Sequence, residues 1–165
     1  MDCISLGESR GLDMNKVQTQ ISFEAAHRLY DVATYSEECR ENLHGHSYKV
    51  TVVVGREDLN DASMVCDFKQ LKTICREKIE DRFDHSCILV TEDPIAEVIY
   101  NNCKKVHLVD ANPTAEWMAC YFSDILKDSL RQIDAELKVA DSRGSWVVSS
   151  TISESRPPII PAIAT

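Results

Sequence analysis

Three histidines are spaced so that two neighbouring strands could bring their side chains together around a metal ion. His44 and His46 are separated by one residue, and alternate side chains of a strand point to the same face, so both rings can face one ion. His27 continues the two-residue spacing of Phe23 and Ala25 at the end of an earlier segment. Three imidazoles with an open fourth position are typical of a catalytic zinc site. Spacing alone leaves a second interpretation open, in which these are hydrogen-bonded core or surface histidines.

Two alternating segments are predicted to be the strands that position these rings. Apolar and polar residues alternate over residues 16–27 and again over 47–56, as in strands with one buried face. Residues 29–42 between them are polar and aperiodic, which predicts a long loop of the kind that often carries function. Pairing of the two strands would bring His27 beside the other two histidines.

Two helices are predicted after the second strand. The first has about four turns, and its apolar stripe consists of residues three or four apart, namely Phe68, Leu71, Cys75, Ile79 and Phe83. For the second helix, Asn112 supplies a cap and Pro113 takes the first helical position, where its missing N–H would have been unpaired. This helix is predicted to run to about residue 135, with these side chains facing inward: Trp117, Tyr121, Phe122, Ile125, Leu126 and Leu130.

Shorter elements are predicted around these helices. Residues 95–109 predict a short helix followed by a strand over 106–109. Residues 137–140 and 146–152 predict two closing strands, joined by a turn in which Gly144 can take a positive φ. The order of elements is therefore β-β-α-(α/β)-α-β-β. Residues 1–15 are expected to form an N-terminal extension, and the proline-containing tail over 156–165 is expected to be extended.

Composition narrows the class of protein. The 165 residues suit a single domain, and 44% hydrophobic with 27% charged residues is typical of a globular protein. A formal charge of −9 repels phosphate backbones, so we expect no nucleic-acid partner. We expect no membrane partner, because no apolar run is long enough to span a bilayer. Seven cysteines without paired Cys-x-x-Cys spacing favour reduced thiols and a cytoplasmic location.

Five motifs, in chain order, resemble those of the 6-pyruvoyl- and 6-carboxytetrahydropterin synthases. They are FEAAHRL (23–29), LHGHSYKV (43–50), MVCDF (64–68) with Leu71 and Lys72, FDH (83–85) and NPTAE (112–116). The resemblance implies an α+β tunnelling fold, in which a four-stranded antiparallel sheet carries two helices on one face. It further implies that subunits close into a barrel as a homo-oligomer, either a trimer or a hexamer.

The resemblance also implies the metal and the substrate. His27, His44 and His46 would bind zinc, and the substrate would be a small-molecule pterin triphosphate. A bound cation lowers the pKa of a coordinated hydroxyl and stabilises enolate-like charge that develops beside it. Proton abstraction from the side chain of the substrate would then be feasible near neutral pH.

Three residues are assigned to proton transfer by the same resemblance. Cys39 looks like the family's catalytic cysteine, and because a free thiol has a pKa of about 8.5, this role requires a cationic neighbour. Asp84 and His85 resemble the family's pair in which a carboxylate orients a proton-shuttling imidazole. Without the resemblance, Asp84 would be interpreted as a residue at a helix end or turn.

Three further residues are assigned to the substrate pocket. Thr114 and Glu116 match family positions at a helix start, where the helix dipole would favour an acid in any case. Glu154 is the candidate pterin anchor, since a carboxylate accepts paired hydrogen bonds from an amino-pyrimidine edge. The chain departs from the family here, because Ser155 stands where the family has threonine.

Glu41 leaves the product open. A variant class of the family, which makes 6-hydroxymethyl-7,8-dihydropterin for folate synthesis, has a glutamate three residues before the His-Gly-His, and this chain has both Cys39 and Glu41. Glu41 could otherwise be a solvated loop acid. The expected function is a zinc-dependent lyase that eliminates triphosphate from 7,8-dihydroneopterin triphosphate to give 6-pyruvoyl- or 6-carboxytetrahydropterin. The alternatives are the hydroxymethyl-forming variant, or a non-catalytic zinc- or pterin-binding protein. The pathway, whether biopterin, queuosine or folate, is left open.

Overall fold

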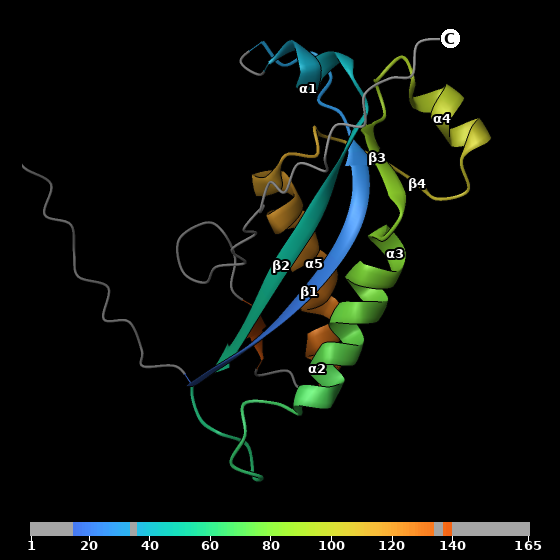
Figure 1. Cartoon of the computed structure of the whole chain (residues 1–165). Coiled ribbons are helices and arrows are strands. Elements are labelled where there is room, and N and C mark those ends of the chain that lie inside the picture. The colour runs from blue at the N-terminus through green and yellow to red at the C-terminus, as the bar shows by residue number, and fades with distance from the viewer. Residues whose placement is uncertain (1–14, 34–35, 134–136, 140–165) are drawn as a thin grey trace, which may run out of the picture.

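Two long strands form the centre of the fold in the computed structural model, which describes residues 15–33, 36–133 and 137–139 (Figure 1). Strand β1, Asn15–His27, pairs antiparallel with β2, His44–Arg56, over 13 residues each. Both predicted strands are confirmed, and β2 begins three residues earlier than predicted, so that it includes His44 and His46. Alternate residues of both strands are buried, because one face of the pair packs on the core and the other does not.

The sheet of the described residues is five-stranded and mixed, with the order β4-β3-β1-β2-β5. Strand β3, Ser86–Val90, is parallel to β1, and β4, Val106–Val109, is parallel to β3. Strand β5, Lys138–Val139, is antiparallel to β2. The prediction of a four-stranded, purely antiparallel sheet was therefore wrong: a fifth strand is present, and two of the strand pairs are parallel.

The prediction failed at β3, a strand whose sequence has no alternating pattern. Ile88, Leu89 and Val90 are all buried, so the strand has no alternation of apolar and polar residues. Strands that are buried in parallel sheets appear as continuous apolar runs, which a search for alternation misses. The run from Cys87 to Val90 was the available signal.

Two helical segments cover the sheet and enclose the core (Figure 1). The first is continuous and consists of α2, Phe68–Cys75, a π-helical turn η1, Arg76–Glu80, and α3, Asp81–Phe83. The second is α5, Ala115–Ile133. The predicted helix of four turns is confirmed except at Phe68, which is 44% exposed and lies outside the buried stripe. The largest fully buried side chains include Leu71, Ile79, Phe83, Phe122, Leu126 and Leu130.

Helix α5 begins later than predicted. Its first turn starts at Ala115, and the Thr114 hydroxyl accepts a hydrogen bond from the Trp117 N–H at 3.3 Å, so Thr114 is the capping residue in place of Asn112. The Asn112 side chain instead accepts from the Tyr30 N–H at 2.7 Å and donates to the Tyr30 carbonyl at 2.8 Å. These two bonds fasten the segment before α5 to the chain that leaves β1.

The remaining predictions have mixed outcomes. Helix α4, Ala96–Asn102, and strand β4 confirm the short helix and strand predicted over 95–109. Helix α1, Glu37–Glu41, lies within the segment that was predicted to be a loop. Strand β5 falls within the predicted strand 137–140, whereas the predicted strand 146–152 and the tail lie outside the described residues. Among the described helices, none is both long and apolar enough to cross a membrane.

Candidate metal centre

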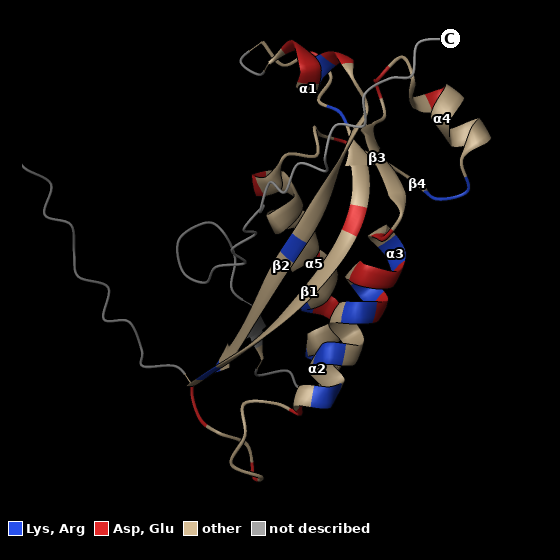
Figure 2. Cartoon of the chain, viewed as in Figure 1, with Lys and Arg blue, Asp and Glu red and all other residues tan. Residues whose placement is uncertain are grey.

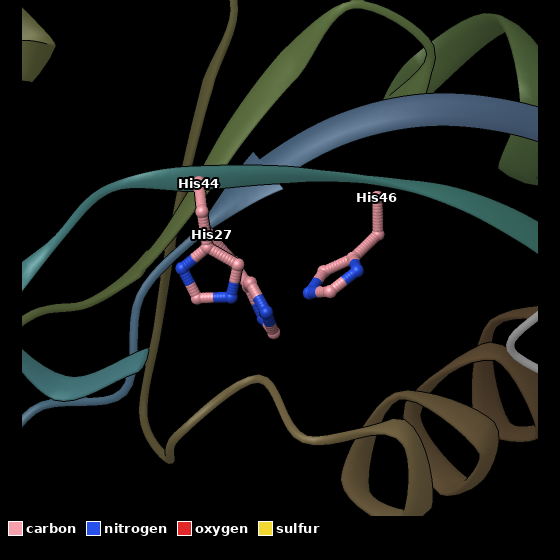
Figure 3. A group of neighbouring side chains, drawn as sticks. All are labelled: His27, His44 and His46. Carbon is pink, nitrogen blue, oxygen red and sulfur yellow. The ribbon is translucent and has the colours of Figure 1, made fainter. Parts of the chain in front are cut away.

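The register of β1 and β2 brings the three histidines together. His27 lies directly opposite His44, and His46 lies opposite Ala25, so all three side chains share the face that packs on the core. The ring centroids are 4.7 Å apart for His27 and His44, 4.9 Å for His27 and His46, and 4.8 Å for His44 and His46. Figure 3 shows the rings on one side of the strands, facing the segment that leads into α5. The predicted meeting of the rings is confirmed.

Hydrogen bonds to backbone carbonyls determine which nitrogen two of these rings present. His27 Nδ1 lies 2.9 Å from the Pro113 carbonyl oxygen, and His44 Nδ1 lies 2.9 Å from the Asn42 carbonyl oxygen. A carbonyl oxygen only accepts, so each Nδ1 carries a proton, and in the neutral form of each ring the lone pair is on Nε2. Such outer hydrogen bonds orient histidine ligands in metal sites.

The electrostatics also suit a metal ion. The pKa of His27 is lowered to about 4, mainly by burial. The hydrogen bond to Pro113 raises this pKa, and the neighbouring His44 and His46 lower it further. The His27 ring is therefore neutral at pH 7, as a metal ligand must be.

The donor set fits zinc. One nitrogen from each ring lies within 4.8 Å of the others, and among the described residues no thiol or carboxylate joins the group. Three imidazoles, with no fourth ligand from the part of the chain that the structure describes, match the arrangement of a catalytic zinc site, in which one position stays open to substrate. Structural zinc sites, in contrast, are closed by four protein ligands.

Helix α1 carries Cys39 and Glu41 beyond the ends of β1 and β2 (Figure 1). Its N-terminus is capped by Ser36, whose side chain accepts from the Cys39 N–H, and the Cys39 carbonyl accepts from the Leu29 N–H at 3.1 Å. Cys39 is partly buried and Glu41 is exposed. Both are thus held next to the end of β1 that bears His27, although neither belongs to the histidine group.

Asp84 and His85 form a hydrogen-bonded pair that is fastened to β1. Asp84 Oδ2 accepts from His85 Nδ1 at 2.7 Å, and Asp84 Oδ1 accepts from the Glu24 N–H at 2.9 Å. The Glu24 hydrogen bond and the His85 hydrogen bond lower the pKa of Asp84. His85 has a φ of 57° and donates its N–H to the Glu24 carbonyl. Its side chain is 80% exposed, and within this chain it does not join the three histidines.

The predicted pocket residues lie at the start of α5 or beyond the described chain. Thr114 is partly buried as the cap, and Glu116 is exposed in the first turn. The adjacent Pro113 is buried and contacts His27 through its carbonyl, so this helix start borders the histidine group. Glu154 lies outside the described residues.

Sequence reasoning missed the residues that support the site. The carbonyls of Pro113 and Asn42 carry no side-chain signal, because any residue supplies a carbonyl. Arg28 was visible within the FEAAHRL motif, and its partner Asp93 comes 65 positions later in an unremarkable segment.

The sequence is similar to those of known tetrahydropterin synthases. The family model for 6-pyruvoyl tetrahydropterin synthase matches residues 16–150. The chain is 32% identical over 133 residues to 6-carboxy-5,6,7,8-tetrahydropterin synthase of Aquifex aeolicus, covering 71% of this chain and 82% of that protein. It is 31% identical over 148 residues to the protein of the same description in Haemophilus influenzae, covering 86% and 98%.

Solved structures share the fold. An uncharacterized protein from Wolinella succinogenes superposes with a TM-score of 0.64 at 20% identity, covering 86% of this chain and 99% of that one. The 6-pyruvoyl tetrahydropterin synthase of Plasmodium falciparum superposes with a TM-score of 0.58 at 19% identity, covering 85% and 99%. With the family model matching most of its length, the chain belongs to the 6-pyruvoyl tetrahydropterin synthase family.

Proposed function

We propose that the protein is a zinc-dependent lyase that acts on 7,8-dihydroneopterin triphosphate. It would eliminate triphosphate and rearrange or cleave the side chain, giving 6-pyruvoyltetrahydropterin or 6-carboxytetrahydropterin. The observation that carries this proposal is the group of three histidines, two of which donate from Nδ1 to backbone carbonyls and so offer Nε2 as the ligand atom of the neutral ring. Relatives described as 6-carboxy- and 6-pyruvoyl-pterin synthases support the choice of substrate class.

His27, His44 and His46 would hold the ion. When bound, zinc supplies Lewis-acid polarisation of the oxygens on the substrate side chain. Cys39, on the neighbouring α1, would remove a side-chain proton. This requires the thiolate, which a nearby cation favours.

Asp84 and His85 would shuttle the proton. Because Asp84 Oδ2 accepts from His85 Nδ1, the Nε2 atom of His85 is left to accept or donate a proton. The carboxylate also favours the imidazolium that forms when His85 is protonated. The exposed ring is accessible to substrate or to a second copy of the chain, and we propose that the chain assembles as a trimer or hexamer.

The pterin ring would be bound by Thr114, Glu116 and Glu154. Glu116 projects from the first turn of α5, next to the segment that contacts His27. Glu154 would accept the paired hydrogen bonds of the amino-pyrimidine edge. We propose a cytoplasmic location, because seven cysteines without paired Cys-x-x-Cys spacing favour reduced thiols.

Glu41 favours a second candidate product. It lies two residues from Cys39 on the same short helix, and it is exposed. A carboxylate can act as a base without thiolate formation, so Glu41 would direct side-chain cleavage to 6-hydroxymethyl-7,8-dihydropterin.

One product analysis tests these alternatives. The protein is stripped of metal, reloaded with zinc and incubated with 7,8-dihydroneopterin triphosphate, and pterins are identified by mass spectrometry. We expect Cys39→Ala to remove the pyruvoyl or carboxy product and Glu41→Ala to remove the hydroxymethyl product. If the zinc-loaded protein leaves the substrate unchanged, the lyase proposal is wrong and a binding protein is favoured.

A further inference from the structure

Helix α1 carries two proposed proton-transfer residues but has no apolar anchor. It is five residues long, and none of its residues is buried. Isolated helices of this length are unstable in water, because nucleation is unfavourable and so short a helix forms too few hydrogen bonds to offset it. Figure 2 shows that acidic residues make up much of α1. The position of Cys39 and Glu41 must therefore be determined by polar contacts with the rest of the chain.

Two contacts join α1 to the residues that follow His27. The Leu29 N–H donates to the Cys39 carbonyl at 3.1 Å, and Arg28 Nη1 donates to the Glu41 carbonyl at 3.3 Å. The Arg28 contact is made at the C-terminal end of the helix, where unpaired carbonyls carry partial negative charge. A guanidinium at this end both satisfies a carbonyl and complements the helix dipole.

Arg28 is itself held in place by a buried carboxylate. Its Nε lies 2.5 Å from Asp93 Oδ2, and the Asp93 side chain is 0% exposed while that of Arg28 is 13% exposed. The second oxygen, Asp93 Oδ1, accepts from the Ile95 N–H at 2.9 Å, so both carboxylate oxygens are occupied. The guanidinium is thereby fixed, with its Nε on Asp93 Oδ2 and its Nη1 on the Glu41 carbonyl of α1.

We propose that Arg28, oriented by Asp93, is a positioning residue that holds α1 beside the histidine group. Its catalytic consequence rests on the proposed function, because Arg28 acts through α1 and not on substrate. Breaking a buried ion pair is destabilising, whereas such pairs add little net stability over apolar replacements. We therefore assign the Arg28–Asp93 pair the role of orienting the guanidinium, because a guanidinium binds two partners at fixed angles.

The decisive variant is Arg28→Lys. Lysine keeps the charge that Asp93 requires, but its ammonium is a single point that replaces the fork, so one side chain no longer serves both Asp93 and the Glu41 carbonyl. The matched control is Arg76→Lys, because Arg76 pairs with Asp81 at 3.7 Å on the surface, with side chains 63% and 57% exposed. A neutral double variant, Arg28→Gln with Asp93→Asn, removes both charges together.

Hydrogen–deuterium exchange and steady-state kinetics are measured on the zinc-loaded full chain. For Arg28→Lys we expect exchange in residues 36–42 to rise about tenfold while zinc content and exchange in β1 and β2 stay unchanged. We expect kcat to fall about tenfold with KM nearly constant, because a proton-transfer group has lost its position. Arg76→Lys should change neither measurement.

The proposal is overturned if exchange in residues 36–42 is unaffected by Arg28→Lys, or if it rises equally throughout the sheet. It is also overturned if neither Arg28 variant folds, since Arg28 would then serve the fold as a whole. Exchange does not depend on turnover. If the wild-type protein converts no pterin, the proposed function is refuted, but the exchange measurement still tests the role of Arg28.

Discussion

Asn112→Ala should weaken both the fold and the metal centre, because the Asn112 side chain fastens the segment that contacts His27. Its two hydrogen bonds with the Tyr30 backbone, at 2.7 and 2.8 Å, are partly buried. A typical intramolecular hydrogen bond contributes about 0.5–1.5 kcal/mol net, so removing both should lower the free energy of unfolding by about 1–3 kcal/mol.

The effect on zinc follows from the next residue. The Pro113 carbonyl accepts the His27 Nδ1 proton at 2.9 Å, and it is held in place by the bonds of Asn112. Loss of an outer hydrogen-bond partner lowers metal affinity about 10- to 100-fold. We expect about tenfold here, because the carbonyl is still present and only its position is loosened.

The assay combines urea unfolding of the metal-free protein with zinc titration against a chelator of known affinity. Asn102→Ala is the matched control, because the Asn102 side chain is exposed and, among the described residues, bonds within its own helix α4, to the Val98 carbonyl at 2.7 Å. This control should alter stability by less than about 0.5 kcal/mol. Zinc affinity that stays within about twofold of wild type in Asn112→Ala, despite lost stability, would refute the reasoning.

Two further predictions concern titrating groups. Hydrogen bonds from the Glu24 N–H and from His85 hold the pKa of Asp84 below its ordinary value. Ionised Asp84 therefore stabilises the folded state above the pKa of about 3.9 that it has in the unfolded chain. This stability is lost as the pH falls through the lower pKa of the folded state. Asp84→Asn should therefore flatten the decline of the urea midpoint below about pH 4, and an unchanged slope would contradict this assignment. Burial raises the pKa of the Cys75 thiol to about 12, so at pH 8 a thiol reagent should label exposed Cys103 and spare Cys75 until the chain unfolds, as peptide mass spectrometry would show.

Local patterns determined the centre of the fold and the metal-binding candidates. The alternation that predicted β1 and β2 reflects the two-residue period of a strand, which is present in the sequence before any pairing occurs. The same period placed His44 and His46 on one face. Only the pairing of the strand that bears His27 with the strand that bears His44 and His46 had to be inferred, and consecutive strands are usually neighbours in a sheet.

The strand directions in the sheet and the long-range hydrogen bonds were determined by the tertiary structure, and local sequence patterns do not indicate them. Strand β3 has no alternation because both of its sides are covered, and its parallel pairing with β1 made the sheet mixed. Asn112 was predicted to cap α5, yet it bonds to Tyr30, 82 positions earlier in the chain. Arg28 and Asp93 likewise meet across 65 positions. Such contacts depend on where the folded chain brings distant segments together, and a hydrogen bond of this kind leaves no periodicity in the sequence for a local pattern to detect.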